Sequence, residues 1–278
     1  MTCFGRWEIM RNHINQRLYC LVELLANPVL SKVSVIDWGC PVISFGNLTS
    51  SKIATLGINP SDREFIDSQG KELDGEKRRF HTLKSLGIVQ WSDVQEKHLN
   101  LIVESCQEYF FRNPYDGWFK KLDYIISGTS MSYYFPSAEA CHLDLIPYAT
   151  NIKWAHLTNE QQLLLLELTG DVLGLLLKNS PIEILVLNGQ TVVENLEKIT
   201  NVKFERRRMH NWTLPRKEDG VYGYSYTGTI DNIAGVYLGH KIKVLGYNHN
   251  IQSSYGVTAQ VQTAIRNWVT KQSEGVFA

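Results

Sequence analysis

The sequence predicts an α/β fold: a three-layer αβα arrangement with a central, mainly parallel sheet of four strands. Four short apolar runs have the length and composition of buried strands, and each ends near a turn signal. Segments with helical spacing separate these runs along the chain. Strands that alternate with helices form parallel sheets, with helices on both faces. The four runs are residues 53–58, 140–146, 182–187 and 242–245.

Length and composition fit one large domain. Of the 278 residues, 44% are hydrophobic and 20% are charged, which is ample for a core. We expect a single domain over residues 1–278, with an N-terminal helical extension (1–40) and an inserted β-rich loop region (202–241). Lys and Arg balance Asp and Glu, 28 against 28. A protein of this charge that binds nucleic acid must gather its basic residues on one face.

The segments between the runs have helical patterns. Residues 7–25 carry apolar side chains at helical spacing, and a proline soon afterwards ends that pattern. Ser61 and Glu64, just after the first run, have the S-x-x-E spacing of a capping box, which predicts the start of a helix. A second capping box at residues 158–161 opens a leucine-rich helix to about residue 178.

The last third of the chain contains two more helices and one irregular region. Asn188-Gly189 predicts a tight turn before a helix that reaches Lys198, and a closing helix is expected over residues 258–271. Residues 202–241 break the alternation, because they are rich in tyrosine, glycine and threonine. We expect a β-hairpin or a long loop there.

No pattern in the sequence predicts a metal, an organic cofactor or a membrane segment. The cysteines are Cys3, Cys20, Cys40, Cys106 and Cys141. Their scatter, without any C-x-x-C, argues against zinc, iron–sulfur and disulfide frameworks. A glycine-rich phosphate-binding motif follows none of the runs. A secretory signal and a long apolar stretch are also missing, so we expect a cytoplasmic monomer with free thiols.

Polar residues stand at the carboxyl end of each run. They are Asn59, Asp144, Asn188 and the pair Asn248-His249. Open parallel sheets bind their ligands outside the carboxyl ends of the strands. We interpret Asn188 as part of a structural turn. For Asn59, Asp144 and His249 together, a functional role is favoured over capping or structural roles.

Four motifs in the same order resemble those of the uracil-DNA glycosylase superfamily, over roughly residues 41 to 268. Asparagine usually stands at the position of Asp144, and the histidine motif has lost its proline. The matching segments are G-I-N-P-S (57–61), L-D-L-I-P (143–147), I-L-V-L-N-G (184–189), and N-H-N (248–250) followed by Ser253 and Ser254.

The resemblance implies a role for each of these residues. Asn59 would hold a water beneath the anomeric carbon of the sugar, and His249 would donate a hydrogen bond to O2 of the departing base. A helix N-terminus at Ser61 would add a favourable dipole. Phe65 would stack on the flipped base, although a core role is an equal alternative, and Ile58 would also contact the base.

Two departures from the uracil pattern point to a cytosine-type base. An ionised Asp144 only accepts hydrogen bonds, which suits the N4 amino group of cytosine. Ser61 stands where classical uracil-DNA glycosylases carry a tyrosine that blocks groups on base carbon 5. The smaller serine leaves room for a substituent there. Cytosine leaves less readily than uracil, and a protonated Asp144 or His249 is expected to help.

A narrower resemblance concerns the signature N-P-S-x-R-E-F, here residues 59–65. The chain is similar to a branch of the superfamily with this signature, and some bacterial phage-defence glycosylases of the superfamily excise glucosylated hydroxymethylcytosine from phage DNA. The resemblance implies the same antiviral substrate class here, with an abasic site as the product.

Local charge predicts the DNA contacts. The basic residues and their associated aromatic and hydroxyl side chains are Arg206, Arg207, Arg208, Trp212, Ser253, Ser254, Lys77, Arg78 and Arg79. A solvated face is the alternative for each basic cluster. Ile251 or Tyr255 would fill the stack that the flipped base vacates.

Two other functions stay open. A uracil or mismatched-thymine glycosylase of base-excision repair is one, since the open C5 side also admits thymine. A non-catalytic nucleic-acid-binding protein on the same fold is the other, because Asp144 and Asn250 depart from the family pattern.

Overall fold

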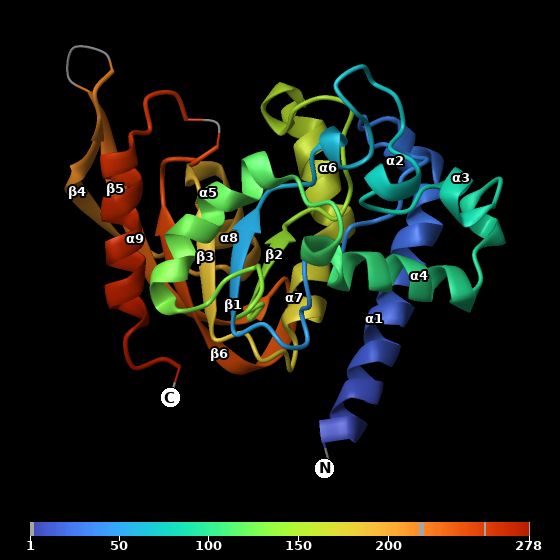
Figure 1. Ribbon diagram of the computed structural model, residues 1–278, viewed down its shortest axis with the longest axis horizontal. Coiled ribbons are helices and arrows are strands. Elements are labelled where there is room, and N and C mark those ends of the chain that lie inside the picture. Colours follow the sequence, from blue (N-terminus) through green and yellow to red (C-terminus); the bar gives the residue numbers. More distant parts are fainter. Residues whose placement is uncertain (1–2, 217–219, 253, 278) are drawn as a thin grey trace.

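The computed structural model describes residues 3–216, 220–252 and 254–277. Six strands form one mixed sheet in the order β2-β1-β3-β6-β5-β4 (Figure 1). Neighbouring strands from β2 to β6 run parallel, whereas β5 and β4 continue the sheet in antiparallel fashion. The strands are β1 (Ile53–Gly57), β2 (Ala140–Asp144), β3 (Ile184–Asn188), β4 (Glu205–Leu214), β5 (Val221–Ile233) and β6 (Val236–Tyr247).

The α/β class is confirmed, but the expected number of four strands is wrong. The insertion over residues 202–241 does not stand apart from the sheet. Residues 205–214 form β4, and most of the tyrosines and threonines of the region lie in β5, which pairs along most of β6. Strand β6 therefore begins at Val236, well before the predicted start at Ile242.

Helices cover both faces of the sheet. Gly246 on β6 lies against Val193 of helix α8, whereas Lys243 on the same strand donates to the Gln272 carbonyl of helix α9. Odd and even residues of a strand point to opposite faces, so α8 and α9 lie on opposite sides. The helices are α1 (Cys3–Leu25), α2 (Pro28–Ser31), α3 (Leu83–Leu86), α4 (Glu96–Gln107), α5 (Asp116–Ile126), α6 (Asn159–Thr169), α7 (Val172–Leu177), α8 (Gln190–Thr200) and α9 (Ala259–Ser273).

Helix starts follow the capping prediction in one case and depart from it in another. Thr158 and Gln161 form the predicted reciprocal cap of α6, although the leucine-rich helix divides into α6 and α7. At Ser61 the expected helix is wrong, because only a single 3-10 turn forms over Asp62–Glu64. The Glu64 side chain turns into the interior instead of closing the box. The dipole expected from a full helix at Ser61 is therefore lost.

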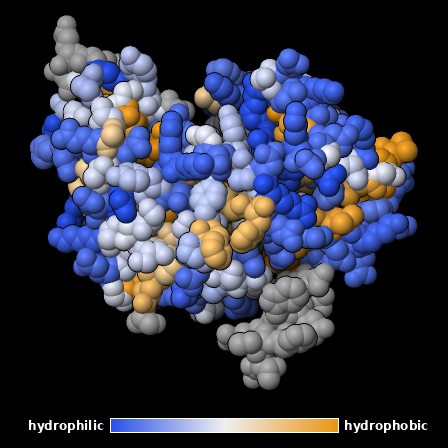
Figure 2. Space-filling model, in the orientation of Figure 1, coloured by the Kyte–Doolittle hydropathy of each residue, from blue (hydrophilic) through white to orange (hydrophobic). Residues whose placement is uncertain are grey.

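The N-terminal helix packs on the body of the domain. The buried Tyr148 hydroxyl donates to the Leu21 carbonyl of α1 at 2.7 Å. In Figure 2 hydrophilic residues cover most of the visible face, and hydrophobic ones form separate patches. Within the described part of the chain, the helices lack the combination of length and apolar character that crossing a membrane requires.

Candidate functional site

A small pocket of about 60 Å³ lies at the carboxyl ends of β1 and β2. Its polar lining residues are Asn59, Ser61, Glu64, His142 and Asp144. Its aromatic lining residues are Phe45, Tyr115, Trp118 and Phe119. The structure therefore brings together three residues predicted from sequence, Asn59, Ser61 and Asp144. The pocket also contains the carboxyl group of Glu64, the imidazole of His142 and a wall of aromatic side chains.

Asn59 is held in a fixed orientation just after β1. Its amide nitrogen donates to the Pro60 carbonyl and to Thr150 Oγ1, both at 3.1 Å, and to the Tyr148 carbonyl at 3.4 Å. These bonds turn the nitrogen toward the protein, which leaves the amide oxygen to accept from a ligand or water. An amide oxygen orients a water but is too weak a base to deprotonate it.

Asp144, at the end of β2, belongs to a buried polar chain. Its Oδ1 lies 3.4 Å from His142 Nε2, and the two side chains are 4% and 1% exposed. His142 Nδ1 lies 2.7 Å from Thr55 Oγ1, which in turn lies 2.5 Å from the Tyr133 hydroxyl. The chain leads from the pocket into the core and fixes the carboxylate at the pocket wall.

Gly57 makes room for this pair on the neighbouring strand. A Cβ atom at that position would lie 3.0 Å from His142 Nε2 and would collide with Asp144 Oδ1. The glycine of the G-I-N-P-S segment is therefore required here by close packing rather than by its backbone conformation.

Glu64 is a buried acid in the same pocket, and it is only 3% exposed. The Tyr109 hydroxyl donates to its Oε2 at 2.7 Å, and Arg79 Nε lies 3.8 Å from the same oxygen. Burial raises the pKa of Glu64 to about 7; the charge of Asp144 also raises it, whereas Arg79 and Tyr109 lower it. The spacing of Glu64 from Ser61 predicts a capping box, and nothing in the local sequence indicates a buried acid in this pocket.

The Tyr109 hydroxyl also connects Glu64 to the aromatic wall. It accepts a hydrogen bond from the Tyr115 backbone N–H at 2.9 Å, at the start of α5. Because that backbone group can only donate, the hydroxyl hydrogen is free to point at Glu64. The acid and the first turn of α5 thus share one hydrogen-bonding group.

His249 does not reach this pocket, which corrects the predicted convergence of three side chains. Its ring is 2% exposed, and Nε2 donates to the Trp212 carbonyl of β4 at 2.7 Å. Strand β3 separates β1 from β6, and β4 lies farther still from β1. Burial lowers the pKa of His249; the Arg216 charge also lowers it and the bond to Trp212 raises it.

The predicted stacking residues are also placed differently. Phe65 is a core residue, 2% exposed and edge-on to Trp38, so it cannot stack on a base. Ile58 is half-buried against the core and does not line the pocket. Aromatic side chains that the sequence analysis did not single out, Tyr115 and Trp118 of the α5 region, line it instead.

Arginines gather on the exposed edge strand β4, as the charge pattern predicts. Residues 206–208 are all exposed. Arg206 lies over the Tyr224 ring at 3.6 Å and Arg208 over the Tyr222 ring at 3.8 Å. Arg207 points to the opposite face of the strand and pairs with Glu205 at 2.8 Å. Two stacked guanidinium groups therefore share one face.

Several other predicted DNA contacts are not available at the surface. Trp212 is fully buried against Trp268, so it cannot stack on a base. The Arg79 guanidinium donates to the Asn113 and Arg63 carbonyls and pairs with Glu64. Its hydrogen bonds therefore go to other protein groups and not to a ligand at the surface. Ile251 is buried, whereas Tyr255 is 81% exposed.

The remaining predicted DNA contacts differ in how far they are exposed to solvent. Lys77 is exposed, and Arg78 and Ser254 are half-buried. Ser253 lies outside the described residues.

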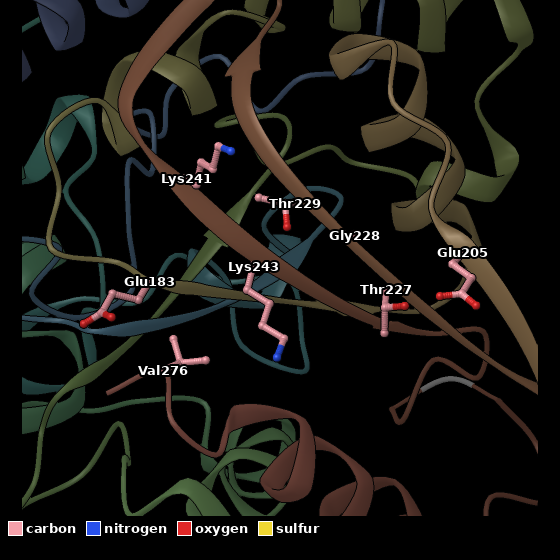
Figure 3. A pocket seen from close by; sticks show the side chains of 8 residues that line it. All are labelled: Glu183, Glu205, Thr227, Gly228, Thr229, Lys241, Lys243 and Val276. Atoms are coloured by element: carbon pink, nitrogen blue, oxygen red, sulfur yellow. The ribbon is translucent and has the colours of Figure 1, made fainter. Parts of the chain in front are cut away.

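A second, wider groove lies over β6, β5 and β4, and none of the residues predicted from sequence lines it. It has a volume of about 620 Å³ and is lined by Glu183, Glu205, Thr227, Gly228, Thr229, Lys241, Lys243 and Val276. Figure 3 shows its charged side chains spread along the strands instead of converging on one point. Lys243 is already bound to the Gln272 carbonyl. The smaller pocket is therefore the stronger candidate site.

Comparison with known proteins by sequence gives no assignment: no protein-family model matches the chain, and no curated protein matches it.

Proposed function

We propose that the protein is a DNA glycosylase that binds an extruded cytosine-type base in the pocket at the carboxyl ends of β1 and β2. One observation carries this proposal: Asn59 and Asp144, which stand far apart in the chain, line the same pocket. They occupy the positions that the glycosylase resemblance associates with the water and with the base edge. The reaction cuts the N-glycosyl bond and leaves an abasic site.

The pocket walls suit a flat base. Tyr115, Trp118 and Phe119 supply aromatic surface. Unstacking a base from the duplex costs roughly a few kcal/mol, and stacking on such side chains offsets this cost. Asp144 offers an acceptor at the pocket wall, which pairs with the N4 amino group of cytosine.

At the sugar, Asn59 positions the attacking water through its amide oxygen. Because an amide does not take up the proton, the bond to the base breaks first, and positive charge builds on the sugar. The chemistry is therefore dissociative, with a sugar cation that water captures.

A substituent on base carbon 5 has a way out of the pocket at Ser61. That residue both lines the pocket and is exposed to solvent. The pocket of about 60 Å³ is far below the roughly 300–1,000 Å³ of most ligand sites, so an attached sugar must extend past Ser61. Hydroxymethylated or glucosylated cytosine in phage DNA is the proposed substrate, and antiviral defence is the proposed role.

The test is base release from defined DNA. Duplexes with uracil, a thymine mismatch, cytosine, hydroxymethylcytosine or its glucoside are incubated with the protein and then treated with hot alkali, which breaks abasic sites. Breaks confined to the modified cytosines support the proposal, and breaks at uracil or thymine alone redirect it to base-excision repair. Salt-sensitive DNA binding without breaks identifies a non-catalytic binder.

A further inference from the structure

Releasing cytosine requires a proton, and Asp144, which accepts from the N4 amino group in the proposed complex, does not supply it. An anionic cytosine is a poorer leaving group than an anionic uracil. Asn59 is not an acid, and His249 is turned to the Trp212 carbonyl, away from the pocket. The inference below rests on the proposed function, and it identifies the missing acid.

Glu64 has the position that this acid needs. It lines the pocket together with Asp144, and its side chain is almost fully buried. Tyr109 and Arg79 both engage Oε2. This arrangement leaves Oε1 as the oxygen that can carry a proton toward a ligand.

We propose that Glu64 is the general acid of base excision and that, together with Asp144, it reads the pairing edge of cytosine. A carboxylate beside a carboxylic acid presents one acceptor and one donor. Cytosine offers the complement, because its N4 amino group donates and its N3 accepts. Uracil has the opposite pattern, with N3–H donating and O4 accepting, so the same pair disfavours it.

Burial supplies the physical reason why Glu64 keeps its proton. It raises the pKa of this carboxyl to about 7, and the negative charge of Asp144 acts in the same direction. A carboxyl with its pKa raised in this way keeps its proton at a higher pH than an ordinary glutamate does. General acids work best when their pKa lies near the operating pH.

Cleavage of the glycosyl bond is coupled to the transfer of one proton from Glu64 to the base. The C1′–N1 bond breaks and both electrons go to the base, while the proton on Glu64 Oε1 moves to N3. Neutral cytosine leaves, and the water held by Asn59 forms a new C–O bond at C1′. That water loses one proton to solvent and becomes the C1′ hydroxyl, and Glu64 takes up one proton from solvent to restore the acid.

The experiment compares single-turnover base release by the wild type and Glu64→Gln over a range of pH. The substrates are duplexes with hydroxymethylcytosine or uracil. Glutamine keeps the shape and still accepts from Tyr109, but it has no acidic proton. We expect the wild-type rate on hydroxymethylcytosine to fall above about pH 7. Glu64→Gln should lose about 100-fold at pH 7 and show no alkaline decline.

Two controls make the result specific. Release of uracil, where it is measurable, should suffer less from Glu64→Gln, because that base leaves without protonation. Glu76→Gln changes an exposed glutamate outside the pocket and should retain the wild-type rate and pH profile.

A carboxyl-carbon NMR titration of the protein alone tests Glu64 without relying on activity. A pKa near 7 is expected, and an ordinary glutamate value overturns the inference even if Glu64→Gln fails to fold. Equal rates and pH profiles in wild type and Glu64→Gln also overturn it while leaving the glycosylase proposal standing. If the wild type releases no base from any duplex, both proposals fall.

Discussion

Asp144 and His142 stand two residues apart on β2, and Asp144 Oδ1 lies 3.4 Å from His142 Nε2. Residues two apart on a strand share a face, so both side chains reach the pocket. His142 engages one carboxylate oxygen and leaves the other for a ligand. The hydrogen-bonding character of residue 144 should therefore set which base is accepted.

Asp144→Asn should move the preference from cytosine-type bases toward uracil. The amide can donate to O4 of uracil, whereas the carboxylate cannot. We expect the ratio of kcat/KM for hydroxymethylcytosine to that for uracil to fall about tenfold or more, in line with roughly 1–3 kcal/mol per base contact. An unchanged ratio would show that Asp144 does not contact the base edge.

Asn59→Ala should abolish excision while leaving DNA affinity close to that of the wild type. The amide is held by Thr150 and two carbonyls, so its removal affects the water more than the surface. A loss of about 100-fold or more in single-turnover rate is expected, as for other positioned polar groups. Fluorescence anisotropy with labelled duplex measures the affinity. Retained activity would remove Asn59 from the mechanism.

Gly57→Ala should destabilise the fold and damage the pocket, because a methyl group would displace Asp144 and His142. Overpacking of this kind costs about 1–3 kcal/mol, which urea unfolding can measure. Gly117→Ala is the matched control. A Cβ there meets only Tyr115, at 3.9 Å, so stability should be unchanged or slightly higher.

Stability should depend on pH through Glu64. Its pKa rises from 4.5 to about 7 in the fold, so its contribution is complete below pH 4.5 and is lost as pH rises through 7. Relative to Glu64→Gln, the wild type should lose up to about 3 kcal/mol of unfolding free energy across that window. Urea titrations at several pH values measure the difference, and a constant difference contradicts the expected pKa.

DNA binding should depend on Arg206 and Arg208 more than on Arg207. The first two lie over tyrosine rings on one face of β4, whereas Arg207 is paired with Glu205. Replacing Arg206 or Arg208 by Gln should reduce the salt dependence of binding by about one unit of slope. Arg207→Gln is the matched comparison. Equal effects of all three would show that the tyrosine-stacked face is not the DNA contact.

The sequence predicted the part of the fold that local patterns encode. The four apolar runs form β1, β2, β3 and the end of β6. Short, continuous apolar runs between helical segments are typical of buried parallel strands. The meeting of Asn59 and Asp144 followed from the rule that parallel strands present their carboxyl ends at one edge.

Long-range contacts decided what the sequence analysis missed. The sequence of β5 shows that it can form a strand, but no local pattern specifies that it pairs with β6. Glu64 satisfied the spacing of a capping box, but a hydrogen bond from Tyr109 draws it inward. His249 stands at the expected sheet edge, yet a carbonyl from β4 determines where its ring points.

The single hydroxyl of Tyr109 has a consequence for tolerance of different ligands. It holds the acid and also anchors the backbone at the start of α5, whose rings form one side of the cavity. A larger ligand that displaces the start of α5 would also displace the Tyr109 hydroxyl. That displacement would change the proton affinity of Glu64. The fit of the base and the proton affinity of Glu64 are therefore linked. Under the proposed function, bases with progressively larger rings should give progressively displaced pH–rate curves.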